Sequence, residues 1–134
     1  MSRFLYVIVL FLCISCQEKH EKVINEYLDQ HLKDPGSYEC VELGTPKLVT
    51  PMSIAFVEIT KRASLGEFPM DSVNSKLDQA KAMFEKNGTN PYDTLGWSVE
   101  HTYRAKNSYG AYELSKVVYT LNKDQSEIIK IQSK

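Results

Sequence analysis

The sequence predicts an α+β fold, in which helices pack on one face of an antiparallel sheet. Two segments have the apolar spacing of helices, and three consecutive segments near the C-terminus alternate like half-buried strands. Hydrophobic residues make up 43% and charged residues 25% of the 134 residues, which is ordinary for a globular protein. The length fits one domain better than two.

The first predicted helix spans residues 19–33. Its apolar residues recur at helical spacing, and Glu and Lys residues occupy the opposite face. The residues of this apolar face are Val23, Ile24, Tyr27, Leu28, His31 and Leu32. Pro35 and Gly36 end the helix, because proline disfavours helical geometry in the preceding residue.

Two strands are predicted next, and a second helix follows them. Residues 38–43 form a short strand, and Ser53 to Arg62 (SIAFVEITKR) is rich in β-forming residues, so we expect a strand there as well. Asp71 or Ser72 then caps a helix that ends at Asn87. The apolar stripe of this helix is Val73, Leu77, Ala80 and Phe84.

The C-terminal third predicts an antiparallel meander of three strands. Residues 97–106 alternate between apolar and polar side chains, residues 107–110 form a hairpin turn, and residues 112–121 return. Residues 127–132 add the third strand. We expect Val117, Tyr119 and Leu121 to face the core, and Trp97, His101 and Tyr103 to pack against the second helix.

Residues 1–16 (MSRFLYVIVLFLCISC) have the pattern of a targeting segment. Arg3 precedes eleven consecutive apolar residues, too few for a membrane-spanning helix, which needs about 20. The sequence Ile14-Ser15-Cys16, followed by a polar run, resembles the lipobox of bacterial lipoproteins. A short uncleaved membrane helix and a plain secretory signal are the alternatives.

The lipobox resemblance implies a diacylglycerol thioether on Cys16, cleavage before it and acylation of the new amine. It divides the chain into a signal peptide (1–15), a lipidated tether (16–20) and a single α+β domain (21–134). Gln17 follows Cys16 where aspartate would favour retention in the inner membrane, so we expect the outer membrane of the bacterial cell envelope. Cys40 is then the one cysteine of the domain; we expect it to be buried.

Two longer motifs extend the resemblance. The segment GWSVEHTYRAKNSYG (96–110), together with KDPGSYE (33–39), is similar to a set of small bacterial lipoproteins of unknown function. These share a lipobox, a DPxSYE turn and a C-terminal GWxxxHxYRAKNxxG hairpin. The element order is also similar to cystatin-like and NTF2-like architectures, although the QxVxG motif of cystatins is absent. These resemblances imply a location in the cell and a fold, but no activity.

Catalytic, metal and nucleic-acid motifs are not recognisable in the sequence. His20, His31 and His101 are not spaced along the sequence like the ligands of a metal ion. No local motif pairs Cys40, as a nucleophile, with His101 as its base. Phosphate-binding glycine patterns are missing, and a formal net charge of -1 argues against nucleic acid. We therefore expect neither an enzyme nor a cofactor.

The leading hypothesis is a non-enzymatic envelope lipoprotein that binds an envelope protein or glycan. The alternative is a small-ligand binder or enzyme with a concave NTF2-like pocket around Trp97, His101 and Tyr103. A cystatin-like protease inhibitor is a third hypothesis. The candidate contact residues are Trp97, His101, Tyr103, Arg104, Tyr109 and Tyr119. The competing structural interpretation places Trp97, His101 and Tyr103 in the core.

Overall fold

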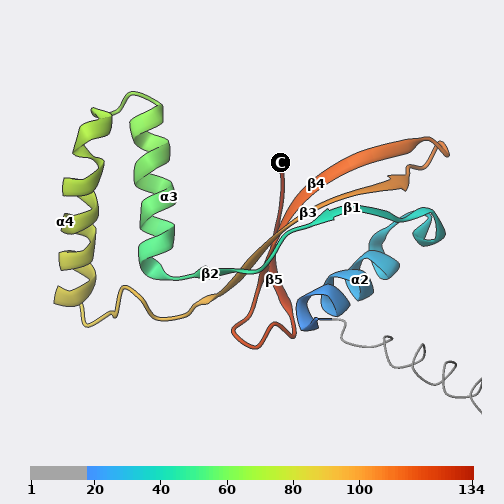
Figure 1. Ribbon diagram of the computed structural model, residues 1–134, viewed down its shortest axis with the longest axis horizontal. Helices are drawn as coiled ribbons and strands as arrows, with labels where there is room; N and C mark the ends of the chain where they lie inside the picture. The colour runs from blue at the N-terminus through green and yellow to red at the C-terminus, as the bar shows by residue number, and fades with distance from the viewer. Residues whose placement is uncertain (1–17) are drawn as a thin grey trace, which may run out of the picture.

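The computed structural model describes residues 18–134, so the predicted signal peptide and Cys16 lie outside the described residues (Figure 1). The fold is α+β, as predicted; within residues 18–134 it has three helices, where the sequence patterns predict two, and a five-stranded antiparallel sheet. The helices are α2 (Lys19–His31), α3 (Pro51–Ser64) and α4 (Val73–Lys86), with short 3-10 turns η1 (Pro35–Ser37) and η2 (Met70–Ser72). The strands are β1 (Glu39–Leu43), β2 (Lys47–Val49), β3 (Gly96–Lys106), β4 (Tyr112–Leu121) and β5 (Ile128–Ser133).

The sheet has the strand order β1-β3-β4-β5, and β2 pairs with β3 beyond the end of β1. The β3–β4 hairpin runs from the pair Trp97 and Leu121 to the pair Lys106 and Tyr112. The predicted meander of three C-terminal strands is therefore confirmed. A bulge interrupts the pairing of β1 with β3 between Cys40 and Glu42.

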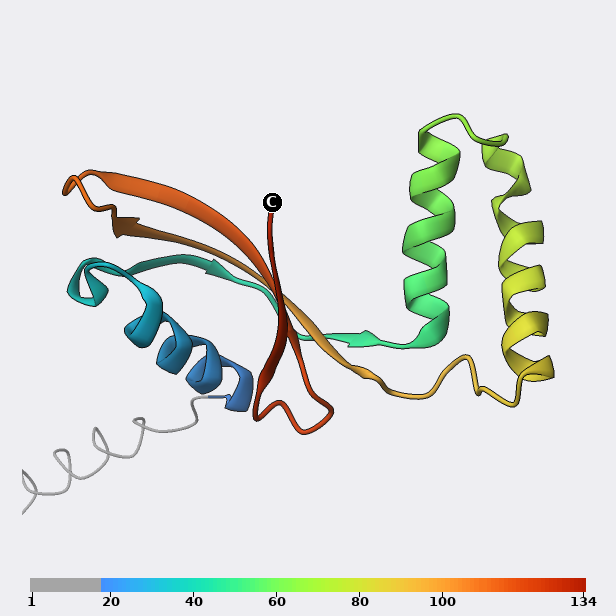
Figure 2. The ribbon, with the colours of Figure 1, turned by 180° about the vertical axis from the view of Figure 1, so that it is seen from behind.

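Helix α2 lies across one face of the sheet, which we call the inner face (Figures 1 and 2). Ile24 and Leu28 of α2 are buried against apolar side chains of the two central strands. Those strand residues are Val99, Tyr103, Ala105, Val117, Tyr119 and Leu121. The prediction that Val117, Tyr119 and Leu121 face the core is confirmed.

Residues 53–62 form part of helix α3, so the prediction of a strand there was wrong. The helix has a strong start: Thr50 Oγ1 accepts a hydrogen bond from Ser53 N at 3.0 Å, and Ser53 Oγ accepts one from Thr50 N at 2.8 Å. Pro51 occupies the first helical position, where its missing N–H costs nothing. The capping signal therefore outweighs the β-forming composition. Helix α3 packs on α4, and its residue Ala63 is buried.

Helices α3 and α4 form a hairpin that stands away from the sheet (Figures 1 and 2). The helices pack on each other, and α3 contacts the rest of the fold through β2 at its base. The prediction that the second helix covers Trp97, His101 and Tyr103 was therefore wrong. Helix α2 covers these strands instead, because it carries the apolar stripe that matches the inner face.

Candidate functional site

An aromatic cluster fills the space between α2, η1 and the inner face. The His101 ring lies 5.0 Å from the Tyr103 ring and 6.2 Å from the Tyr119 ring, centroid to centroid. Tyr38, just after η1, lies 5.9 Å from both His101 and Tyr103. Tyr27 of α2 meets Tyr119 edge to face at 5.9 Å. His101, Tyr103 and Tyr119, three of the predicted site residues, thus lie together.

His101 forms the polar centre of this cluster. Its Nε2 atom lies 3.1 Å from the Tyr38 hydroxyl, and its side chain is buried. Burial lowers the pKa of His101 from 6.5 to about 4, so the ring is neutral at neutral pH. Burial also raises the pKa of Tyr38, with a further contribution from a hydrogen bond to Cys40. The His101 Nδ1 atom is buried and has no hydrogen-bond partner among the described residues.

The cluster is packed and leaves little room for a ligand. His101 is 2% exposed and Tyr119 is 1% exposed, so both side chains are almost fully buried despite their size. A hollow of about 220 Å³ borders Tyr103, but it opens to solvent between the end of α2 and the β3–β4 turn. This geometry fits a core that fixes α2 and η1 on the sheet.

Trp97 lies at the other end of β3 and is half-buried. Its Nε1 atom donates a hydrogen bond to the Lys123 carbonyl at 2.9 Å, which holds the β4–β5 turn. Gly96 precedes it at a close approach of the two strands: a Cβ atom there would overlap the carbonyl oxygen of Leu121. These two residues of the GW motif therefore have a structural role.

The β3–β4 turn presents Tyr109 to solvent, with 94% of the residue exposed. Asn107 builds the turn, because its Oδ1 atom accepts hydrogen bonds from Tyr109 N at 3.0 Å and Ala111 N at 3.2 Å. Gly110 adopts a φ of 78°, which favours glycine. Tyr109 thus lies apart from the aromatic cluster.

The opposite side of the sheet, which we call the outer face, is rich in charge. Arg104 lies here, because alternate residues of β3 point away from α2. The cationic residues of this face are Lys47, Arg104, Lys106, Lys116, Lys130 and Lys134, and the acidic residues are Glu39, Glu42 and Glu100. Arg104 is the one predicted site residue that belongs to this surface.

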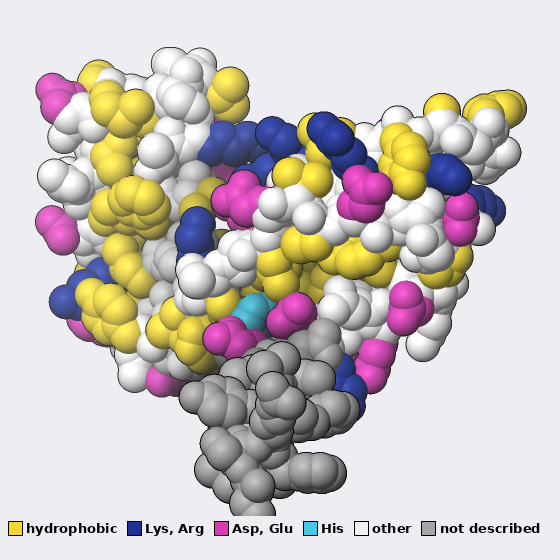
Figure 3. Space-filling model, turned by 45° about the vertical axis from the view of Figure 1, so that its right-hand side comes forward, with side chains coloured by type: hydrophobic (Ala, Val, Ile, Leu, Met, Phe, Trp, Pro, Cys, Tyr) yellow, Lys and Arg dark blue, Asp and Glu magenta, His cyan; other side chains and the backbone are white. Residues whose placement is uncertain are grey.

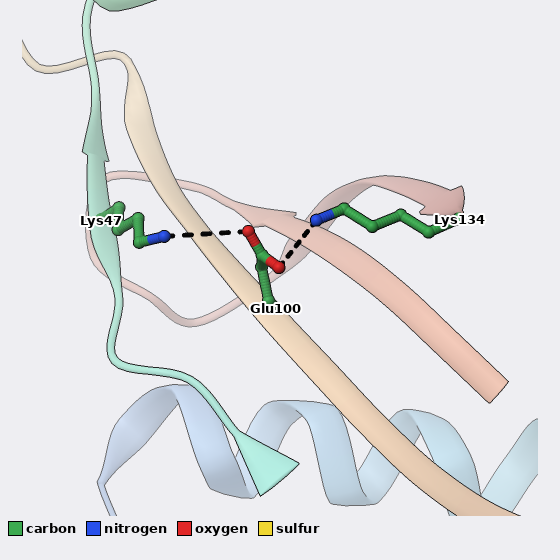
Figure 4. Close-up of polar contacts among 3 residues, drawn as sticks. All are labelled: Lys47, Glu100 and Lys134. Carbon is green, nitrogen blue, oxygen red and sulfur yellow. Dashed lines mark hydrogen bonds and ion pairs between the residues drawn. The ribbon is translucent and has the colours of Figure 1, made fainter. Parts of the chain in front are cut away.

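Glu100 is held between two lysines of the outer face (Figure 4). Lys134 Nζ donates to Glu100 Oε2 at 2.7 Å, and Lys47 Nζ lies 3.7 Å from Oε1. The hydrogen bond and charge of Lys134, with a smaller contribution from Lys47, lower the pKa of Glu100. A hollow of about 200 Å³ lies beside this group and is also bordered by Lys116 and Glu42.

Cys40 is exposed, so the prediction that it is buried was wrong. It lies next to the bulge in β1, which is an edge strand of the sheet. Within residues 18–134 it is a free cysteine, and no group of three or more His, Cys, Asp or Glu residues there could hold a metal ion.

The helical hairpin has an apolar surface that the sequence interpretation missed. Ile54, Phe56 and Val57 of α3 are 52%, 52% and 65% exposed, and Met83 of α4 is 61% exposed. Figure 3 shows hydrophobic side chains along the height of the hairpin. A correct helix assignment for residues 51–64 would have revealed this surface, because apolar residues then occur on more than one side of α3.

Comparison of the chain with protein-family models, curated proteins and solved structures gives no match. In the part of the chain that the structure describes, no helix is long and apolar enough to span a membrane.

Proposed function

We propose that this chain is a non-enzymatic lipoprotein of the bacterial cell envelope, anchored through Cys16 in the outer membrane. Its α+β domain binds another envelope protein or a glycan. The anchor rests on the lipobox-like sequence before Cys16, and the binding role rests on the surface of the folded domain.

The start of α2 supports the anchor. Helix α2 begins at Lys19, three residues after Cys16. An extended chain spans at most about 3.6 Å per residue, so the helix begins within about 11 Å of the lipidated residue. His20 is already 5% exposed, so the fold begins almost directly at the anchor. Such a short tether suits a domain that works close to a membrane.

The exposed apolar surface of the α3–α4 hairpin is the observation that carries the binding role. Monomeric proteins rarely leave a large apolar patch uncovered, and such patches mark interaction sites. Both helices of the hairpin expose apolar side chains: Ile54 and Val57 on α3 and Met83 on α4. A helix that is apolar on several sides is normally buried on several sides. The hairpin therefore supports a role in interaction.

The pocket alternative has less support. It requires an accessible cavity around Trp97, His101 and Tyr103, but His101 is buried and its ring packs against Tyr103 and Tyr119. Trp97 lies apart from these rings, where it binds the Lys123 carbonyl.

The anchor is tested by membrane fractionation and labelling with radioactive palmitate in the producing bacterium. The full chain and the variant Cys40→Ala are expected in the membrane fraction and labelled, because Cys40 belongs to the folded domain. The variant Cys16→Ala is expected to lose the label. Equal labelling of Cys16→Ala and the full chain, or no labelling of either, would contradict the proposal.

A further inference from the structure

The outer face of the sheet differs in charge from the rest of the molecule. It carries six cationic side chains against three carboxylates, defined above from the strand register. All 17 acidic residues and all Lys and Arg residues except Arg3 lie in the described part of the chain. The remainder of the described chain therefore has nine cationic residues against fourteen acidic ones. The positive charge is concentrated on one face.

Apolar side chains lie between these cations. Leu114 is 50% exposed and pairs with Arg104 across the β3–β4 hairpin. Tyr112 is 52% exposed and pairs with Lys106, whose Nζ atom lies 5.5 Å from the centre of the tyrosine ring. At these two neighbouring positions, a cation of β3 thus lies beside an apolar side chain of β4. A purely electrostatic ligand would leave Leu114 and Tyr112 without a contact.

The position of α2 argues against a membrane as the ligand of this face. Helix α2 covers the inner face, and residues 1–17 precede its N-terminus (Figure 1). A chain tethered before α2 therefore has its attachment point on the side of the sheet opposite to the cations. The outer face is left free for a ligand that approaches from elsewhere.

We propose that the outer face binds an acidic segment of another protein, one that combines Asp or Glu with apolar side chains. The carboxylates of the partner meet Arg104, Lys116 and Lys130, and its apolar side chains cover Leu114. Arginine and tyrosine are enriched at protein interfaces, and complementary charge favours association. This surface is distinct from the α3–α4 hairpin, so the proposal adds a second binding surface to the proposed binding role. It uses the lipid anchor only in the argument against a membrane ligand.

The test uses the full chain, purified in detergent, and an immobilised random copolymer of glutamate and tyrosine. The double variant Lys116→Glu/Lys130→Glu is expected to bind the copolymer about tenfold more weakly than the original chain. The control Lys33→Glu/Lys86→Glu makes the same change in net charge away from the outer face. It is expected to bind like the original chain, and circular dichroism checks that both variants are folded.

A second variant separates the apolar contribution from the charge. Leu114→Ser is expected to weaken binding to the glutamate–tyrosine copolymer but not to polyglutamate. No binding of the copolymer by the original chain, or equal losses in the two double variants, would overturn the proposal. Stronger binding to polygalacturonate or to phosphatidylglycerol vesicles than to the copolymer would overturn it as well. Because the assay uses purified protein, its result is independent of palmitate labelling in cells.

Discussion

His101 is a buried titratable residue that makes the stability of the core depend on pH. Its neighbours in space are tyrosine rings and the Tyr38 hydroxyl, so burial without a counter-charge favours the neutral ring. The histidine was placed on the core side of its strand by alternation alone. Its contact with Tyr38 was not predictable, because 63 residues separate the two along the chain.

The lowered pKa of His101 makes stability depend on pH. In the unfolded chain His101 takes up a proton near pH 6.5, whereas in the folded chain it does so at about 4. The contribution of the neutral His101 ring to the free energy of unfolding is therefore complete above about pH 6.5 and is lost as the pH falls toward 4. We expect the free energy of unfolding to drop by about 2–3 kcal/mol from this residue between about pH 7 and about pH 4.5.

Urea unfolding at several pH values measures this effect. His101→Gln is expected to flatten the pH dependence over this range, because glutamine does not titrate. His31→Gln, at an exposed position, is expected to keep the steep dependence. Parallel pH profiles for the original chain and His101→Gln would show that His101 is not the titrating group.

Gly96 lies where β3 and β4 approach each other closely, so the position has no room for a side chain. Gly96→Ala is expected to lower the free energy of unfolding by about 1–3 kcal/mol, because the new Cβ atom overlaps the Leu121 carbonyl oxygen. Gly36→Ala is the control, since a Cβ atom there meets Asp34 Oδ1 at an ordinary 3.5 Å. Equal stability of the two variants in urea unfolding would contradict this explanation.

At the scale of elements, sequence patterns predicted most of the fold but misassigned α3. Alternation around Ala55, Val57 and Ile59 also fits a helix, since the apolar residues are dense enough to satisfy both periods. The deciding signal was the Thr50-Pro51 start with Ser53, which is a local helix cap. By contrast, the β3–β4–β5 meander was predictable, because each strand alternates and each turn has suitable residues.

The cap of α3 gives a test of this explanation. Thr50→Ala removes the side chain that accepts a hydrogen bond from Ser53 N, and is expected to destabilise α3 by about 1 kcal/mol. Amide hydrogen exchange in α3 measures the change. Ser64→Ala at the other end of α3 is the control, and we expect a smaller effect from it. Equal exchange in Thr50→Ala and the original chain would contradict the role of the cap.

At the scale of the molecule, sequence patterns could not predict which helix covers the sheet. Both helical segments had an apolar stripe, and the choice depends on the stripe of α2 matching the inner face. The consequence is a molecule with three distinct regions. These are a packed inner face under α2, a cationic outer face and a helical hairpin with an apolar surface. Of the predicted site residues, His101, Tyr103 and Tyr119 belong to the first region and Arg104 to the second.

The proposed lipid anchor at Cys16 decides where these surfaces act. Mass spectrometry of the N-terminal peptide from protein extracted from bacterial membranes tests it most directly. We expect a peptide that begins at Cys16 and carries a diacylglyceryl group and an amide-linked acyl chain. An unmodified Cys16, in a chain that begins at Met1 or at any other residue, would contradict it.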